Sequence, residues 1–413
     1  MNPKVKTGLL GHPLSHSVSP MLHALLGDDA YTLFDIPKEG LEAFLHSEQW
    51  DAVNVTIPYK KEVLRYCDSV SERAKKCGSA NILIRKNGKI HADNSDYTGF
   101  CDLAHGIDFS NKKVCILGSG GVSATVRAAA LDLGAGEIVT VSRTTGVRYE
   151  DVERYCDSDI LINATPVGMF PNADALPVDP ARFSKLSAVL DLIANPLRST
   201  LVLKAEEAGI RARGGFRMLC SQAHEAFRVF HESEPKLSRD ELYRTALSQT
   251  QSIALVGMPG SGKSTFGKFL AEAFQRPFFD TDELIEAKEN RSIPQIFESL
   301  GEDYFRKSER ETVKKASEKQ GIILALGGGA PLFKENRLHL KQNSLVVQLD
   351  CPTEELSREN RPLSTSLERL VQMQKERAGA YAAVCDLRFS FSKSDPEAQK
   401  KLLTLIQAYR EEL

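Results

Sequence analysis

Two glycine-rich stretches decide the fold of this chain: Val114-Cys-Ile-Leu-Gly118-Ser-Gly120-Gly121 and Ile253-Ala-Leu-Val-Gly257-Met-Pro-Gly260-Ser-Gly262-Lys263-Ser264. Each begins with the apolar run of a buried strand and leads into a helical pattern, over residues 122–133 and 265–274 respectively. A strand, a glycine loop and a helix in this order are typical of nucleotide-binding α/β proteins, because the loop and the helix N-terminus bind phosphate. The chain therefore carries two such units, about 140 residues apart.

Composition and charge argue against several classes of protein. The 413 residues are 42% hydrophobic, and no run approaches the ~18 consecutive apolar residues of a transmembrane helix. Residues 1–248 carry 29 Lys and Arg against 31 Asp and Glu, and residues 249–413 carry 24 against 24, so neither part has the basic excess of a nucleic-acid binder. The eight cysteines form no Cys-x-x-Cys pair, and we expect reduced thiols in a cytoplasmic protein. The oligomeric state is left open.

The remaining pattern predicts three α/β domains. Strand-like runs at 137–142, 160–164 and 188–193 alternate with helical ones, which favours a parallel sheet over residues 106–215. Residues 1–105 contain short strands at 6–10, 31–35, 52–57 and 81–85. Residues 251–413 form the third domain. The polar segment 231–250 holds the capping box Ser238-x-x-Glu241, and we interpret it as a linker helix, the alternative being a surface helix inside one larger domain.

The second glycine stretch is a complete P-loop, Gly257-x-x-x-x-Gly262-Lys263-Ser264. Its glycines let backbone N–H groups turn towards phosphate oxygens, Lys263 is placed to reach the β- and γ-phosphates, and the Ser264 hydroxyl is a ligand for Mg²⁺. ATP and Mg²⁺ are therefore the predicted ligands. The predicted nucleotide-binding residues are Gly257, Gly260, Ser261, Gly262, Lys263, Ser264 and Thr265.

Five further motifs follow in order: Asp280-Thr-Asp282, Phe305-Arg306-x-x-Glu309, Gly327-Gly328-Gly329, Arg361-Pro-Leu and Arg377-x-x-x-Tyr381. Together with the P-loop they resemble shikimate kinase across residues 250–413. The resemblance implies that Arg306 and Arg377 hold a substrate carboxylate, that Asp282 binds the ring hydroxyls and accepts a proton, and that Asp280 supports Mg²⁺. It also implies that Gly328 and Gly329 admit the substrate and that Arg361 closes over the phosphates from a lid. The lid is short, since only Glu359 and Asn360 separate Arg358 from Arg361.

The first glycine stretch has the spacing Gly118-x-Gly120-x-x-Ser123, with serine in place of a third glycine. The next strand ends at Ser142-Arg143-Thr144, where an NAD site would carry an acid for the ribose 2′-hydroxyl. Arg143 suits a 2′-phosphate instead, so we expect NADP(H), with a plain surface arginine as the alternative. The cofactor-binding residues predicted from this half are Gly118, Ser119, Gly120, Gly121, Val122, Ser142, Arg143 and Thr144.

Around this loop lie Ser17-x-Ser19-Pro, Asn54-Val-Thr56-x-Pro-x-Lys60, Asn163-Ala-Thr165 and Met218-Leu-x-x-Gln222. This set resembles shikimate dehydrogenase over residues 4–235. The resemblance implies a substrate domain (1–105, completed by 216–235) and a Rossmann NADP-binding domain (106–215), separated by a cleft. It assigns Lys60 and Asp96 as the catalytic pair, with Asp96 also binding substrate, and the other substrate contacts to Ser17, Ser19, Thr56, Asn81 and Gln222.

The same resemblance places Thr165 and Met218 beside the nicotinamide, although Met218 could equally be core packing. One departure is Ala194, where the family usually has tyrosine before Asn-Pro.

The two resemblances together imply a bifunctional enzyme of the shikimate pathway. NADPH would reduce 3-dehydroshikimate to shikimate, and ATP with Mg²⁺ would phosphorylate shikimate to shikimate 3-phosphate. Three alternatives stay open: a quinate/shikimate dehydrogenase fused to the kinase, one half acting as an inactive scaffold, and a P-loop ATPase acting on nucleic acid. The charge balance argues against the last of these.

Overall fold

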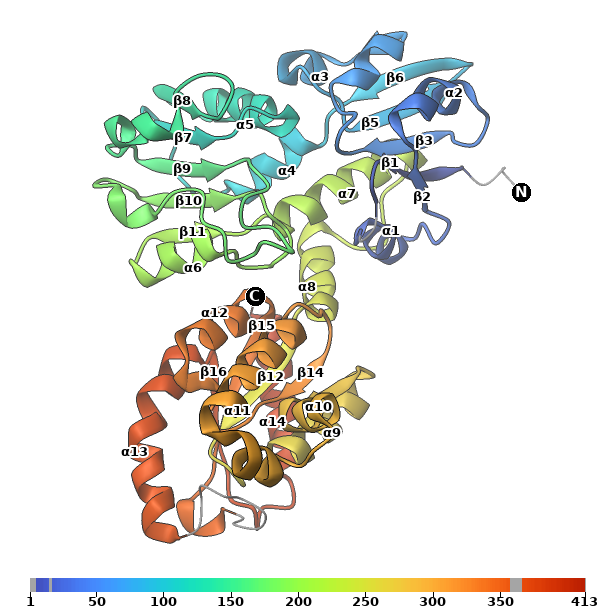
Figure 1. Ribbon diagram of the computed structural model, residues 1–413. Helices are drawn as coiled ribbons and strands as arrows, with labels where there is room; N and C mark the ends of the chain where they lie inside the picture. The colour runs from blue at the N-terminus through green and yellow to red at the C-terminus, as the bar shows by residue number, and fades with distance from the viewer. Residues whose placement is uncertain (1–4, 15–16, 357–365, 413) are drawn as a thin grey trace. The chain divides into compact units, whose positions relative to one another are not determined.

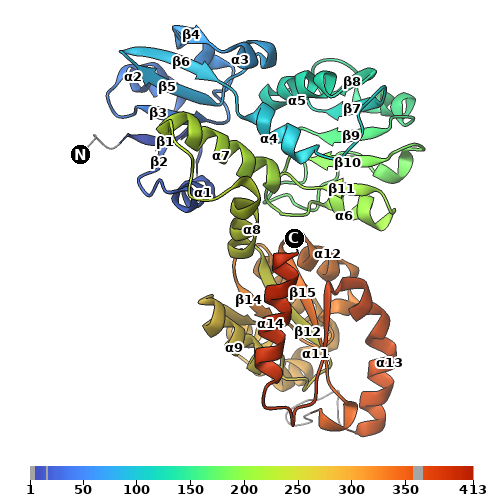
Figure 2. The ribbon, with the colours of Figure 1, turned by 180° about the vertical axis from the view of Figure 1, so that it is seen from behind.

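The structure is a computed structural model that describes residues 5–14, 17–356 and 366–412. The chain divides into two compact units, Met1–Ala246 and Leu247–Leu413, and each is described by itself. Each unit holds one of the two glycine loops. Figures 1 and 2 show front and back views of the ribbon. Within the described residues, no helix combines the length and the apolarity that crossing a membrane requires.

The first sheet of unit one is mixed, with strand order β2-β1-β3-β5-β6-β4. Its strands are β1 (Thr7–Gly11), β2 (Thr32–Asp35), β3 (Ala52–Val55), β4 (Ser69–Val70), β5 (Ile82–Lys86) and β6 (Lys89–Asp93). Its helices are α1 (Ser19–Leu26), α2 (Leu41–His46) and α3 (Glu72–Cys77), with short 3-10 turns at Lys38–Gly40 and Glu62–Tyr66. A core that includes Leu10, Trp50 and Tyr59 packs on one face.

The pairing of these strands brings distant segments to one edge of the sheet. Strands β1 and β3 are parallel, so the residues after both strands lie together. Strand β5 runs antiparallel to β3 and to β6, with Asn54 opposite Ile82 and Ile82 opposite Asp93. The residues before β5 and after β6 therefore reach the same edge. This edge carries Ser17, Thr56, Asn81 and Asp96.

The second sheet is entirely parallel, with order β11-β10-β9-β7-β8, as the sequence predicted. Its strands are β7 (Lys113–Leu117), β8 (Glu137–Val141), β9 (Ile160–Asn163), β10 (Ala188–Asp191) and β11 (Arg211–Arg213). The helices are α4 (Asp96–Leu103), α5 (Gly121–Asp132) and α6 (Thr200–Glu207), with 3-10 turns at Tyr149–Tyr155 and Pro180–Arg182. The chain leaves β7 for β8 on one side and returns to β9 on the other. Ligands bind parallel sheets at such a switch point.

Helix α7 (Phe216–His231) returns from the second sheet to the first (Figure 1). Its residues Ala226 and Phe230 pack into a core with Leu9 and Ile82 of the first sheet. Near its start, Met218 packs into a core of the second sheet. Helix α7 therefore closes the first domain and connects it to the second.

The second unit is built on a parallel sheet with order β13-β14-β12-β15-β16. Its strands are β12 (Ser252–Gly257), β13 (Phe278–Asp280), β14 (Ile323–Ala325), β15 (Ser344–Asp350) and β16 (Leu387–Ser390). Its helices are α9 (Lys263–Phe274), α10 (Thr281–Glu289), α11 (Ile293–Ser317), α12 (Lys334–Asn343), α13 (Leu367–Val384) and α14 (Ala398–Glu411), with 3-10 turns at Ala330–Leu332 and Thr353–Glu355. Two apolar cores cover its two faces.

The boundary between the units falls inside α8 (Arg239–Thr250). The capping box predicted at its start is present, because the Ser238 backbone N–H donates to Glu241 Oε2 at 2.9 Å and the Glu241 N–H donates to Ser238 Oγ at 3.3 Å. Several element boundaries differ from the predictions by one or two residues. Helix α9 begins at Lys263, two residues early, because the αL glycine at 262 starts the helix directly.

Two candidate active sites

Lys60 and Asp96 form an ion pair at the edge of the first sheet. Lys60 Nζ donates to Asp96 Oδ2 at 2.6 Å, and the two side chains are 18% and 3% exposed. Lys60 follows β3, and Asp96 is the first residue of α4. The pairing of β3, β5 and β6 therefore brings together two residues 36 positions apart. A lysine that is largely sheltered from water and paired with a buried carboxylate is suited to donate a proton to a bound molecule.

Asn81 is the centre of the polar network around this pair. Its Nδ2 lies 3.1 Å from Asp96 Oδ1, 3.1 Å from Gln222 Oε1 and 3.0 Å from Ser95 Oγ. Its Oδ1 accepts from the Ser95 backbone N–H at 2.6 Å. Asn81 thus connects Gln222 of α7 to Asp96 at the start of α4.

The other predicted substrate residues lie at the same edge. Ser17 and Ser19 stand at the start of α1, where Ser17 Oγ accepts from the Ser19 backbone N–H at 3.2 Å. Thr56 follows β3 and packs on Gly11, the last residue of β1, so closely that a Cβ at Gly11 would lie 2.5 Å from Thr56 Cγ2. Helix N-termini and hydroxyl groups are suitable for binding a carboxylate.

The dinucleotide loop begins at Gly118, whose φ of +105° requires glycine. The loop continues through Ser119 and Gly120 into α5 at Gly121. Ser123 occupies the place of the third glycine, and its buried hydroxyl donates back to the Gly118 carbonyl at 2.7 Å. The Ser123 side chain therefore stabilises the conformation of the loop. The loop also lies next to Lys60, since a Cβ at Gly121 would lie 3.6 Å from Lys60 Cβ.

The end of β8 forms a tight turn in which Ser142 Oγ accepts from the Thr145 backbone N–H at 2.9 Å. Arg143 is exposed in this turn, and Thr144 Oγ1 lies 3.3 Å from Ser119 Oγ of the glycine loop. Thr165 also lies against this loop, because a Cβ at Gly118 would be 2.9 Å from Thr165 Cγ2. The turn and Thr165 are thus both next to the dinucleotide loop.

Met218 and Ala194 were both singled out in the sequence, and neither offers a polar side chain to the site. Met218 is 6% exposed and belongs to the core, which favours the packing interpretation over a nicotinamide contact. Ala194 is half-buried after β10 and offers only a methyl group.

In the second unit the P-loop has the expected shape. Gly257, Gly260 and Gly262 all have positive φ, at 149°, 79° and 88°. Lys263 is buried, and its Nζ donates to the carbonyls of Gly257 at 3.0 Å and Met258 at 2.9 Å. The ammonium is therefore held inside the loop, over the region that phosphates would fill.

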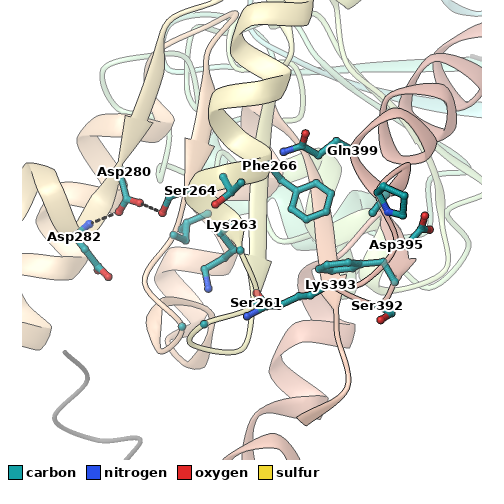
Figure 3. A pocket seen from close by; sticks show the side chains of 18 residues that line it. Ser261, Lys263, Ser264, Phe266, Asp280, Asp282, Ser392, Lys393, Asp395 and Gln399 are labelled. Carbon is teal, nitrogen blue, oxygen red and sulfur yellow. Dashed lines mark hydrogen bonds between the residues drawn. The ribbon is translucent and has the colours of Figure 1, made fainter. Parts of the chain in front are cut away.

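The Ser264 hydroxyl and the Asp280 carboxylate lie together beside the loop. Ser264 Oγ donates to Asp280 Oδ2 at 2.6 Å, and Asp280 Oδ1 accepts from the Asp282 backbone N–H at 2.9 Å (Figure 3). Mg²⁺ prefers such oxygen ligands and takes few of them from protein, the rest being water and phosphate. The described residues contain no cluster of three or more His, Cys, Asp or Glu able to hold a metal by themselves. The pair fits Mg²⁺ bound together with a nucleotide.

The residues predicted for the kinase substrate gather around three glycines. Arg306 Nη1 lies 3.0 Å from Glu309 Oε2, a buried carboxylate that orients it. A Cβ at Gly329 would lie 2.5 Å from Arg306 Nη1, one at Gly328 would lie 3.1 Å from Arg377 Nη1, and one at Gly327 would lie 2.7 Å from Asp282 Oδ1. Two arginines and an aspartate therefore surround the backbone of three consecutive glycines. This arrangement suits the binding of an acid that also carries hydroxyl groups.

A cavity of about 530 Å³ contains much of this chemistry (Figure 3). Its lining includes Lys263, Ser264, Asp280, Asp282 and Gly328. The other side is lined by Phe391, Ser392, Lys393 and Asp395 of the loop between β16 and α14 and by Gln399 of α14, all of which the sequence reasoning missed. The available signal was their place after the last strand of the sheet, at its ligand-binding edge. Arg361 and the short lid lie outside the described residues.

The comparisons with known proteins match parts of both units. Residues 9–83 match the model of the shikimate dehydrogenase substrate binding domain, and residues 259–407 match the shikimate kinase model. A shikimate dehydrogenase (NADP(+)) of Clostridium beijerinckii is 33% identical over 248 residues, which is 55% of this chain and 92% of the relative.

Solved structures resemble the same part of the chain. A chorismate mutase/shikimate 5-dehydrogenase fusion from Clostridium acetobutylicum is 30% identical with a TM-score of 0.55, covering 59% of this chain and 97% of that one. Shikimate 5-dehydrogenase from Thermus thermophilus, solved with NADP(H) and shikimate, is 28% identical with a TM-score of 0.54, covering 59% and 98%. The chain is thus an enzyme that belongs to the shikimate dehydrogenase family and carries a shikimate kinase domain after the dehydrogenase part.

Proposed function

We propose that the chain catalyses two consecutive reactions: NADPH-dependent reduction of 3-dehydroshikimate to shikimate, and ATP- and Mg²⁺-dependent phosphorylation of shikimate to shikimate 3-phosphate. The observation that supports this most is the Lys60–Asp96 pair at 2.6 Å, next to the dinucleotide loop at Gly121. Reduction of a ketone needs a proton donor and a hydride donor at one place, and this arrangement offers both positions.

In the reduction, bound NADPH would supply the hydride to the carbonyl carbon. The Lys60 ammonium donates its proton to the carbonyl oxygen, which becomes the new hydroxyl. Asp96 holds Lys60 in place and binds a hydroxyl of the ring, while Asn81 and Gln222 orient the other hydroxyls. Ser17, Ser19 and Thr56 bind the remaining polar groups, with Ser17 and Ser19 on the carboxylate.

The cofactor would be held by Gly118, Ser119, Gly120, Gly121 and Val122, with Thr165 beside them. Ser142, Arg143 and Thr144 would hold the 2′-phosphate of NADP. The exposed guanidinium of Arg143 at the end of β8 supports this choice over NAD.

In the phosphorylation, Mg²⁺ bound through Ser264 and Asp280 would neutralise charge on the phosphates. Gly260, Ser261, Gly262 and Thr265 bind phosphate through the loop, and Lys263 attracts the transferred group. Asp282 takes the proton of the attacking hydroxyl, and Arg306 and Arg377 hold the carboxylate. Arg361 is proposed to meet the phosphates from the lid.

We further propose a substrate domain over 1–105 completed by 216–235, a Rossmann domain over 106–215, a linker at 231–250 and a kinase domain over 251–413. The composition and the relatives are consistent with a cytoplasmic protein that acts on small molecules. Separate assays of the purified chain test the function. We expect oxidation of shikimate with NADP and ATP consumption only when shikimate is present. Faster oxidation of quinate than of shikimate, or a preference for NAD, would favour the quinate/shikimate alternative. If one of the two assays shows no activity, the corresponding half is an inactive scaffold.

A further inference from the structure

A buried carboxylate beneath the dinucleotide site has no part in the chemistry described above. Asp191 is the last residue of β10 and is 0% exposed. It accepts hydrogen bonds from Ser199 Oγ at 2.5 Å, from the Ile193 backbone N–H at 3.1 Å and from Asn163 Nδ2 at 3.0 Å. In the described part of the chain no cationic side chain pairs with it. Burial raises its pKa to about 6. A carboxylate in such a place is costly, so a role beyond filling space is expected.

The hydrogen bond from Asn163 to Asp191 defines how the side-chain amide of Asn163 is oriented. The side-chain amide of Asn163 can be turned either way, with its oxygen and nitrogen exchanged. An ionised carboxylate only accepts, so Asp191 requires the nitrogen of Asn163 to face it. The same nitrogen also donates to the Val167 carbonyl at 3.2 Å. The oxygen of Asn163 must then point the other way.

On that other side is Thr165. Asn163 Oδ1 accepts from the Thr165 backbone N–H at 3.1 Å and from Thr165 Oγ1 at 2.7 Å. With the amide reversed, its nitrogen would face the Thr165 backbone N–H and that bond would be lost, while the Thr165 hydroxyl, which already accepts from the Val167 backbone N–H, would have to accept instead of donate. Thr165 Cγ2 packs at the Gly118 turn, as described above. A continuous chain of hydrogen bonds and contacts therefore runs from Asp191 through Asn163 and Thr165 to the dinucleotide loop.

We propose that Asp191 is a positioning residue for the dinucleotide: by acting only as an acceptor it fixes the Asn163 amide, which holds Thr165 against the Gly118 loop. This inference rests on the proposed use of NADPH by the first unit. It predicts that removing the acceptor-only character of residue 191 weakens cofactor binding, although Asp191 touches no cofactor itself.

The test is a titration of the full chain with NADPH, followed by NADPH fluorescence, for the wild type and four variants. Asp191→Asn keeps the shape but replaces one of the two acceptor oxygens by a donor, and Asn163→Leu removes the acceptor for Thr165. The double variant tests whether Asp191 and Asn163 act through one series of hydrogen bonds. Ser199→Ala is the matched control, because it removes a buried donor to the same carboxylate but leaves the Asn163 contact in place. ATP-dependent phosphorylation of shikimate by each variant reports on the rest of the chain.

We expect the Kd for NADPH to rise about fivefold or more in Asp191→Asn and in Asn163→Leu, as the loss of one or two hydrogen bonds implies. The double variant should bind NADPH no more weakly than the single variant with the lower affinity, since both substitutions break the same series of hydrogen bonds. Ser199→Ala should lower the unfolding temperature and leave the Kd within about twofold. The proposal is overturned if Asp191→Asn lowers the unfolding temperature while its Kd stays at the wild-type value. If that variant does not fold, an unchanged Kd in Asn163→Leu overturns it equally. A wild-type chain that binds no NADPH would instead remove the proposed function.

Discussion

Replacing Lys60 by methionine removes the proposed proton donor while keeping a side chain of similar length. Lys60 Nζ is 2.6 Å from Asp96 Oδ2, and the aspartate side chain is only 3% exposed. In the variant Asp96 keeps Asn81 as a donor at 3.1 Å but loses its cationic partner. Both the proton transfer and the local charge balance are therefore affected, whereas the P-loop of the second unit is not.

The size of the effect follows from the proton transfer. A positioned general acid contributes about 10²- to 10⁴-fold to a rate, which is about 3–5 kcal/mol on the barrier. We therefore expect kcat for NADPH-dependent reduction to fall by at least about 10² in Lys60→Met. The stability cost is expected at or below the ~3 kcal/mol lower limit for breaking a buried pair, because Lys60 is 18% exposed.

The assay follows NADPH absorbance with 3-dehydroshikimate, and separately ATP consumption with shikimate. The matched control is Lys61→Met, an exposed lysine next in the chain that should leave both rates unchanged. Reduction by Lys60→Met within about tenfold of wild type, with a folded chain, would refute the role of Lys60 as general acid.

Three further substitutions test the P-loop, the cofactor site and the burial of His23. Lys263→Ala should abolish ATP-dependent phosphorylation while NADPH-dependent reduction persists; loss of both activities in a folded chain would show that the sites are not independent. Arg143→Ala should raise the KM for NADPH about tenfold or more and leave the KM for NADH unchanged, and equal changes for both cofactors would contradict the 2′-phosphate contact. His23 is fully buried, and burial lowers its pKa from 6.5 to about 3, so the stability that its neutral form provides is present above pH 6.5 and lost as the pH falls. Between pH 7 and pH 5 the wild type should lose about 2 kcal/mol of unfolding free energy that His23→Phe does not lose, measured by urea unfolding at each pH; an identical loss in both proteins would contradict the burial argument.

The parts of the fold that the sequence predicts best are those with strict residue requirements. Gly257, Gly260 and Gly262 adopt positive φ that other residues avoid, so the P-loop can be identified from its spacing alone. Parallel strands buried on both faces have apolar runs, which is why the sheet around Gly118 is predictable. The Lys60–Asp96 pair was identified by resemblance, and the structure adds the sheet register that brings the two together.

Other features depend on contacts between distant positions and leave no local pattern. Asn81 binds Gln222 across 141 residues, and nothing near either residue in the sequence indicates that bond. Ser123 interrupts the glycine pattern, and its bond to the Gly118 carbonyl becomes visible only in three dimensions. The polar cluster around Asp191 is similar, because an Asp after an apolar strand usually indicates a turn. The loop that carries Lys393 contributes to the cavity through its place beside the sheet, not through a motif.

The central claim is that shikimate is the product of one site on this chain and the substrate of the other. One incubation of the purified protein with 3-dehydroshikimate, NADPH, ATP and Mg²⁺ tests it, with NADPH loss and shikimate 3-phosphate formation followed separately. Our account predicts that NADPH falls first, that shikimate 3-phosphate follows and approaches the NADPH consumed, and that omitting ATP leaves shikimate to accumulate. NADPH loss without any phosphorylated product when all four are present, or no consumption of either nucleotide, would contradict it.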